Sequence, residues 1–94
     1  MKIRAKICLN IHGLNWERVV TTKKDISLKD FLVDLSKRYD KMIRNLLFDS
    51  EEERLRSDYV VLLNGRHYFT FADQILTKLH DGDSVVILAP MVGG

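Results

Sequence analysis

Residues that define specialised protein classes are rare in this sequence of 94 residues. It has one cysteine and one proline, and it contains no run of about twenty apolar residues of the kind that spans a bilayer. Cys8 cannot form an internal disulfide, which is typical of a protein from a reducing compartment. The formal net charge of +2 is too small to favour nucleic acid or an anionic membrane. We therefore expect a cytoplasmic protein with no nucleic-acid and no membrane partner.

Candidate catalytic and metal-binding groups are also few. His12, His67 and His80 lie in three separate segments without the spacing of metal ligands. Cys8 has no neighbouring histidine and no helix N-terminus to activate its thiol, so we interpret it as an inert filler of a strand. No glycine-rich phosphate loop and no pair of catalytic acids stands out. We predict no metal site and no catalytic residue in this chain.

The composition is that of a small globular protein, with 46% hydrophobic and 30% charged residues. We expect a single domain over residues 1–94 that ends in a flexible tail over about 90–94. Apolar and polar residues alternate over 3–11, which predicts a strand with one buried face. Turn residues follow at 12–15, and residues 16–22 predict an antiparallel return strand. The expected buried side chains of the first strand are Ile3, Ala5, Ile7, Leu9 and Ile11.

The middle of the chain predicts one long helix over residues 28–46. Ser27 is a candidate N-cap, and Asp30 stands in the first turn, where it favours the helix dipole. Apolar residues then recur every three or four positions. The expected buried stripe consists of Leu28, Phe31, Leu32, Leu35, Tyr39, Met42, Ile43 and Leu46. The charged segment 49–58 has few apolar anchors, so we interpret it as an exposed, solvated connection.

A second hairpin is expected in the C-terminal half. Asn64-Gly65 is the dipeptide that best fits a type I′ turn, so residues 59–63 and 66–69 should pair. A short helical turn is plausible within 71–79. This order of elements predicts an α+β fold in which a mixed sheet of four or five strands packs on one main helix.

The last strand, over residues 84–89, is apolar on both faces. Val85 and Ile87 lie on one face, and Val86 and Leu88 lie on the other. Because the helix can cover only one face, the second face is either tucked under loops or exposed as a docking patch. The docking interpretation places Leu88, and with it Val86, against a partner protein beside the tail.

The tail runs through Pro90, Met91 and Val92 to Gly93-Gly94. Two glycines without Cβ atoms can pass through a channel too narrow for side chains and leave the carbonyl carbon of Gly94 open to attack. A terminal carboxylate is ionised at neutral pH and is a poor acylating group until another protein activates it. The alternative is an ordinary frayed terminus.

Taken together, these features resemble the β-grasp, or ubiquitin-like, sulfur carriers. In that family an Asn-Gly hairpin, a Leu-x-Asp-Gly-Asp-x-Val turn and a C-terminal Gly-Gly occur in this order, as they do here at 64–65, 79–85 and 93–94. Within the family the chain is most similar to the small subunits of molybdopterin synthase, the MoaD-like carriers, which resemble the ThiS-like carriers. It departs from them at Ala89, where the tail often has proline. The resemblance implies a β-grasp fold for the whole chain.

The resemblance also implies a two-stage chemistry at Gly94. An adenylating enzyme of the ThiF or MoeB type would use ATP and magnesium to turn the carboxylate into an acyl-adenylate, and a persulfide would then give a thiocarboxylate. The tail would thread into a MoaE-like large subunit of molybdopterin synthase and donate the sulfur to a pterin precursor. Gly93 would permit the threading, and Pro90, Met91 and Val92 would set the direction of the tail. The chain itself would be a non-catalytic carrier that binds no cofactor.

Three alternatives stay open at this point. The activated Gly94 could be joined to lysines of target proteins, as in ubiquitin-like modifiers. The carrier could deliver its sulfur to transfer RNA or to the thiazole of thiamine instead. The chain could also be a plain β-grasp interaction module whose diglycine is incidental.

Overall fold

A computed structural model gives the fold and describes residues 1–49, 55–56 and 59–89. Within these ranges the chain forms two main helices and a five-stranded sheet. The strands are β1 (Lys2–Leu9), β2 (Leu14–Thr21), β3 (Val60–Leu63), β4 (Arg66–His67) and β5 (Ser84–Leu88). The helices are α1 (Leu28–Arg38) and α2 (Met42–Leu47), and three short 3-10 turns cover Asn10–His12, Tyr68–Thr70 and Gln74–Leu76.

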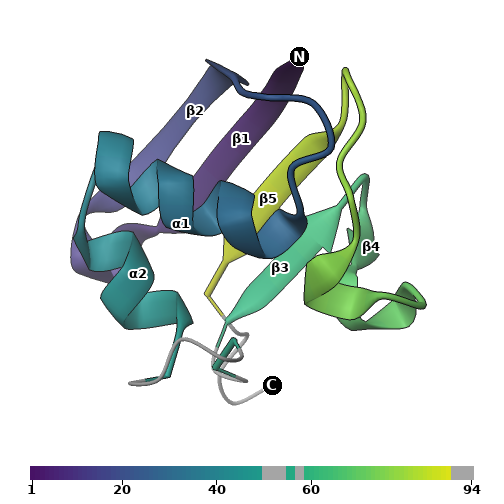
Figure 1. The fold of residues 1–94 in the computed structure, drawn as a ribbon. Coiled ribbons are helices and arrows are strands. Elements are labelled where there is room, and N and C mark those ends of the chain that lie inside the picture. The colour runs from purple at the N-terminus through teal and green to yellow at the C-terminus, as the bar shows by residue number, and fades with distance from the viewer. Residues whose placement is uncertain (50–54, 57–58, 90–94) are drawn as a thin grey trace.

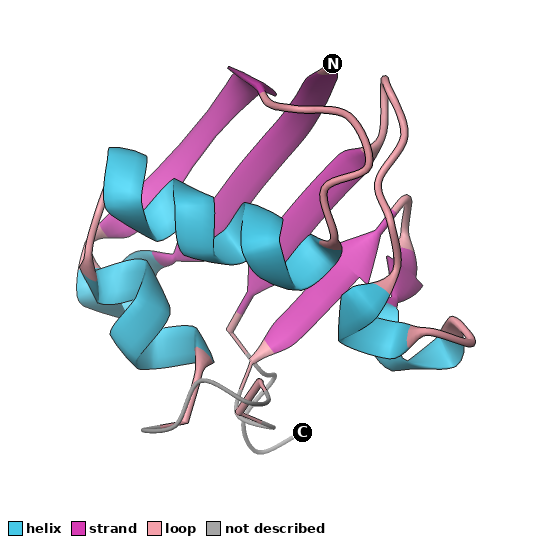
Figure 2. Cartoon of the chain, viewed as in Figure 1, coloured by secondary structure: helices cyan, strands magenta, loops and turns pink. Residues whose placement is uncertain are grey.

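The sheet is mixed, with the strand order β2-β1-β5-β3-β4. β1 and β5 run parallel, and the other neighbouring strands are antiparallel. α1 and α2 lie on the same face of this sheet (Figures 1 and 2). The α+β arrangement and the predicted strand number are therefore confirmed. The last strand in sequence is the central strand in space, so the sheet is completed by contacts between distant parts of the chain.

β1 and β2 form the predicted N-terminal hairpin. The side chains of Ile3, Ala5, Ile7 and Leu9 are all buried against the helices. The predicted strand over 3–11 is too long by two residues, because Asn10–His12 forms a 3-10 turn that Gly13 ends with a φ of 72°. Ile11 leaves the strand pattern at this turn and is 85% exposed, so its predicted burial is wrong.

α1 begins where the sequence indicates. The Ser27 hydroxyl oxygen accepts a hydrogen bond from the Asp30 backbone nitrogen at 3.1 Å, which caps the helix. The single helix predicted over 28–46 is wrong at 39–41, where the chain turns into α2. Asp40 Oδ1 accepts the backbone N–H of Met42 at 2.9 Å, and this bond favours a new start at that point. Tyr39 and Met42, which were expected in the buried stripe, are 39% and 42% exposed.

The second hairpin turns at Asn64-Gly65 as predicted, since both residues have positive φ angles, 52° and 83°. β4 is shorter than the predicted 66–69, because the chain enters a 3-10 turn at Tyr68. The helical turn expected within 71–79 is the 3-10 turn Gln74–Leu76.

The connection over 49–58 lies largely outside the described residues. Leu55, the single apolar residue of this segment, is 9% exposed and forms an isolated bridge with Phe48. The interpretation of this segment as an exposed connection is therefore wrong at Leu55, which anchors it to the core. A single leucine inside a charged run carries too weak a periodic signal to be recognised from the sequence.

Candidate functional site

β5 leads directly to the tail that the sequence singles out. It ends at Leu88, and Ala89 is exposed. The predicted site residues Pro90, Met91, Val92, Gly93 and Gly94 lie outside the described residues, so their roles stay predictions. In the sheet, Leu88 pairs with Cys8 of β1 and with Val60 of β3. β5 therefore ends in the middle of the sheet, with a strand on each side, and this end of β5 is here called the exit.

One side-chain contact joins the two sides of this exit. His12 follows β1 and Tyr59 precedes β3, the two strands that flank β5. His12 Nε2 and the Tyr59 hydroxyl oxygen lie 3.2 Å apart and are hydrogen-bonded. The pair bridges the end of the sheet at which β5 ends. In the sequence, 47 positions separate the two residues, so no local pattern indicates their contact.

The face of the sheet opposite to α1 and α2, here called the open face, carries an apolar stripe beside the exit. This open-face stripe consists of Cys8, Val60, Leu62, Val86 and Leu88. Each of the five is half-buried, and the core side chains of β5, Val85 and Ile87, point the other way. In the described part of the chain, no helix lies over the stripe (Figure 1). Val86 and Leu88 are thus on an accessible face, as the pattern of β5 indicates.

An aromatic pair continues the stripe toward the β4 edge. His67 pairs with Leu62 across β3 and β4, so its ring stands on the open face. The Phe69 ring lies with its centroid 4.0 Å from that of His67 and is 56% exposed. Sequence reasoning placed no site residue on β3, although the residues of β3, like those of β5, are apolar at consecutive positions and so indicate a strand with two apolar faces.

The other end of β5 is held by a network of hydrogen bonds. Asn64 donates from Nδ2 to Asp83 Oδ1 at 2.9 Å and accepts the backbone N–H of Ser84 at its Oδ1, also at 2.9 Å. Asp81 Oδ1 accepts the backbone N–H of Lys2 at 2.7 Å, and Asp83 Oδ2 accepts that of His80 at 2.7 Å. The two motifs that carry the family resemblance thus lock β5 between β1 and β3 at the end away from the exit.

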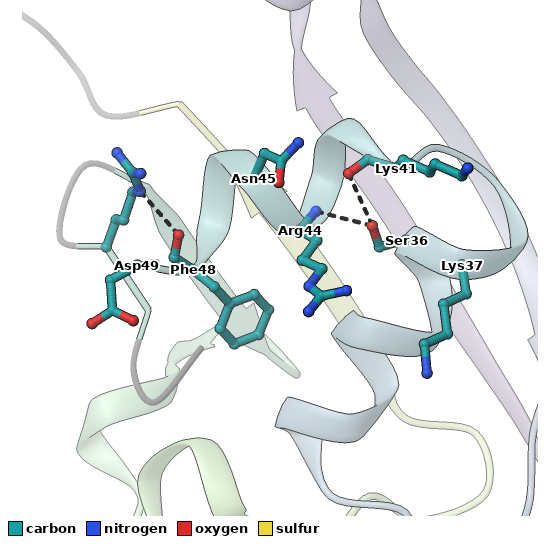
Figure 3. Close-up of a pocket in the computed structure, with 8 residues that line it drawn as sticks. Ser36, Lys37, Lys41, Arg44, Asn45, Phe48 and Asp49 are labelled. Atoms are coloured by element: carbon teal, nitrogen blue, oxygen red, sulfur yellow. Dashed lines mark hydrogen bonds between the residues drawn. The ribbon is translucent and has the colours of Figure 1, made fainter. Parts of the chain in front are cut away.

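A hollow of about 790 Å³ lies on the helix side of the molecule. Its described lining is Ser36, Lys37, Lys41, Arg44, Asn45, Phe48, Asp49 and Arg56. Figure 3 shows the Lys37 and Arg44 side chains extending from α1 and α2, with Lys41 pointing away from them.

Many polar groups of this hollow are already engaged. The Ser36 hydroxyl accepts the Arg44 backbone N–H at 3.1 Å and lies 3.1 Å from the Lys41 carbonyl oxygen, to which it donates. Arg56 Nε donates a hydrogen bond to the Phe48 carbonyl oxygen at 3.0 Å. Arg44 and Asp49 also have interaction partners. The hollow is best explained as the corner between α1 and α2.

Within 1–49, 55–56 and 59–89, no group of three or more His, Cys, Asp or Glu side chains is arranged to hold a metal ion. None of the helices in the described part of the chain is long and apolar enough to cross a bilayer. Cys8 is a free, half-buried thiol on the open face, and its inert role stays a prediction.

The fold and the position of the exit define a ubiquitin-like β-grasp protein, with β5 in the middle of the sheet. The family model described as the ThiS family matches residues 10–94. The chain therefore belongs to the ThiS family, whose members are ubiquitin-like sulfur carriers and modifiers. No curated protein sequence matches this chain.

Solved structures show the same fold at low sequence identity. SAMP1 from Haloferax volcanii has a TM-score of 0.78 and 20% identity, with 100% of both chains covered. A protein described as molybdopterin converting factor, subunit 1, from Pyrococcus furiosus has a TM-score of 0.65 and 20% identity, over 96% of this chain and 98% of that one. The Amycolatopsis orientalis BexX/CysO complex contains a chain with a TM-score of 0.70 and 21% identity, over 98% and 99%.

Proposed function

We propose that this protein is a sulfur carrier whose Gly94 carboxylate is adenylated and then converted to a thiocarboxylate. The observation that carries the proposal is the membership in the ThiS family together with the course of β5, which delivers the tail from the middle of the sheet. The chain contributes a carbonyl group on a narrow stalk and no catalytic residue. The activation is the work of a partner enzyme of the adenylating type.

The chemistry at Gly94 proceeds in two steps. The carboxylate oxygen attacks the α-phosphorus of ATP, and pyrophosphate leaves with magnesium as its counter-ion. The terminal sulfur of a persulfide then attacks the carbonyl carbon, AMP leaves, and a thiol cleaves the resulting acyl disulfide to release the thiocarboxylate. Gly93 keeps the approach to the carbonyl free of side chains, and Pro90, Met91 and Val92 direct the tail.

For the acceptor of the sulfur we propose a pterin precursor in a molybdopterin synthase, with this chain as the small subunit. The similarity to the molybdopterin converting factor subunit of Pyrococcus furiosus supports this destination. A large subunit would then receive the tail. Co-expression with the synthase large subunit from the same genome tests it, because the thiocarboxylate form alone should transfer its sulfur in the complex. Transfer to transfer RNA or to thiazole precursors, and none to the pterin, would contradict it.

A second candidate function is that of a protein modifier, in which a lysine amine attacks the activated Gly94 carbonyl. The similarity to SAMP1 from Haloferax volcanii, a small archaeal modifier protein, favours it. Tryptic peptides in which a lysine carries this tail would establish the modifier function. Their absence from cells that contain abundant activated carrier would argue against it.

The proposed partner interface is the open face at Leu88, and to a smaller degree at Val86. Burial of one such aliphatic side chain is worth about 1.5–3 kcal/mol. Leu88→Asp should therefore weaken binding of the adenylating enzyme by about tenfold or more, while the fold is retained. A Leu88→Asp variant that fails to fold would show that Leu88 belongs to the core.

The intact mass of the protein tests the carrier chemistry directly. Incubation with the adenylating enzyme, ATP, magnesium and a sulfur donor should replace one terminal oxygen of Gly94 by sulfur. A chain extended by one residue beyond Gly94 is the matched control, since an error near 1 Å in position can cost about a hundredfold in rate. An unchanged mass with an active enzyme, or equal sulfur loading of the extended chain, would contradict the carrier function.

A further inference from the structure

A row of three cations runs along the open face next to the stripe. The residues of this β1 cation row, Lys2, Arg4 and Lys6, are exposed and alternate with buried residues of the core. Successive members of the row are about 6.6 Å apart along the strand, and they carry the same charge. The pairing of β1 with β5 places Arg4 beside Ser84 and Lys6 beside Val86. The row therefore borders the stripe directly.

The three cations form no ion pair with a carboxylate of the described residues. Arg38 forms an ion pair with Asp34, and the Asp83 carboxylate lies beside the His80 ring, but neither contact involves the row. Glu17 is opposite Lys6 in the register with β2, yet the two side chains form no ion pair. The carboxylates of Asp81 and Asp83 accept backbone N–H groups in the turn before β5.

Protection of a sheet edge does not explain these cations. Exposed lysines often stand on edge strands, where they prevent pairing with other chains. β1 is an inner strand with β2 on one side and β5 on the other. Three like charges next to an accessible apolar stripe are instead the arrangement expected where a surface meets carboxylates of another protein.

We propose that the open face binds a partner protein through two neighbouring contacts of different chemistry. The stripe packs on an apolar patch of the partner, and Arg4 and Lys6 face carboxylates on the side of that patch away from the tail. This inference rests on the proposed carrier function, since the partner is the adenylating enzyme. The stripe contributes affinity, and the cations raise the association rate and orient the carrier so that its tail points into the enzyme.

Charge reversal on the two faces tests this proposal. The double variant Arg4→Glu, Lys6→Glu is compared with Lys37→Glu, Lys41→Glu, which changes the net charge equally on the helix side. Association of each full-length chain with the immobilised adenylating enzyme is measured by surface plasmon resonance. The open-face pair should slow association by about tenfold or more at low salt, and the helix-side pair should leave it nearly unchanged. Circular dichroism verifies that both variants fold.

The salt dependence separates a local contact from general charge. At high ionic strength the wild type and the open-face variant should associate at similar rates, because salt screens the cations. Equal slowing by both pairs, or no slowing by either, would overturn the proposal. The proposal would also be overturned if Arg4 and Lys6 bound a single-stranded RNA probe while their charge reversal left the rate of association with the enzyme unchanged.

The mass readout distinguishes this inference from the function on which it rests. If Gly94 gains sulfur in every variant while all association rates agree, the ionic contact is refuted and the carrier function stands. If the wild type is never activated by the active enzyme, the carrier function is refuted and the inference falls with it.

Discussion

The two faces of β5 have nearly the same amino-acid composition but different surroundings. Val85 and Ile87 are 0% and 1% exposed beneath the helices, whereas Val86 and Leu88 are only half-buried on the open face. Apolar side chains that stay partly accessible contribute less to the stability of the fold than buried ones, because less of their surface is removed from water. The difference indicates that one face of this strand serves stability and that the other is available for a partner.

The largest expected effect separates these faces by stability. Ile87→Ala should lower the free energy of unfolding by about 2–5 kcal/mol, because the substitution leaves a cavity in the core. Leu88→Ala is the matched control on the open face and should lower it clearly less. Urea unfolding followed by circular dichroism measures both. Equal losses would show that the open face is packed as the helix face is.

Two serines, one on the helix side and one on the open face, allow a second comparison of stability between the two sides of the molecule. Ser36 is 3% exposed, and its hydroxyl holds the corner between α1 and α2. Ser36→Ala should lower the free energy of unfolding by about 1–3 kcal/mol, since the Arg44 backbone N–H loses its acceptor. Ser84→Ala on the open face should change it by less than about 0.5 kcal/mol. Thermal unfolding of both variants gives the comparison, which fails if Ser84→Ala is the more damaging.

The hairpins and the two-faced apolar pattern of β5 could be predicted from the sequence because each depends on local periodicity or turn chemistry. The central place of β5 could not, because it depends on pairing with β1 and β3, which are distant in the sequence. The break between α1 and α2 could not be predicted, because the hydrogen bonds of Ser36 and Asp40 that hold it do not interrupt the apolar periodicity of the sequence. The contact of His12 with Tyr59 joins segments that only the sheet brings together. The β1 cation row was visible as alternating charge, but its place beside the stripe depends on the parallel pairing with β5.

A smaller effect on stability is expected at the contact of His12 with Tyr59 beside the exit. Tyr59→Phe removes the hydroxyl that bonds His12 and should lower the free energy of unfolding by about 0.5–1 kcal/mol. Tyr39→Phe is the matched control, because the Tyr39 hydroxyl makes no hydrogen bond within the described residues. Urea unfolding gives the loss of unfolding free energy for both variants. If Tyr39→Phe costs as much, the bridge beside the exit contributes nothing of its own.

The smallest effect on the free energy of unfolding is expected at Cys8, whose thiol also reports directly on whether a partner covers the open face. This half-buried thiol pairs with Leu88 in the stripe, so a bound partner should cover it. Cys8→Ala should leave the free energy of unfolding nearly unchanged. Alkylation of the wild type by N-ethylmaleimide, followed by mass spectrometry, should become several-fold slower when the adenylating enzyme is present.

The converse experiment uses the alkylated chain. Alkylation places a bulky group in the stripe, so the modified wild type should lose binding, while Cys8→Ala treated with the same reagent should bind as well as untreated Cys8→Ala. This control separates the effect of the modification from any other effect of the reagent. Should the partner leave the alkylation rate unchanged while it activates Gly94, the open face is not where it binds, and both faces of β5 would have to be explained by the fold alone.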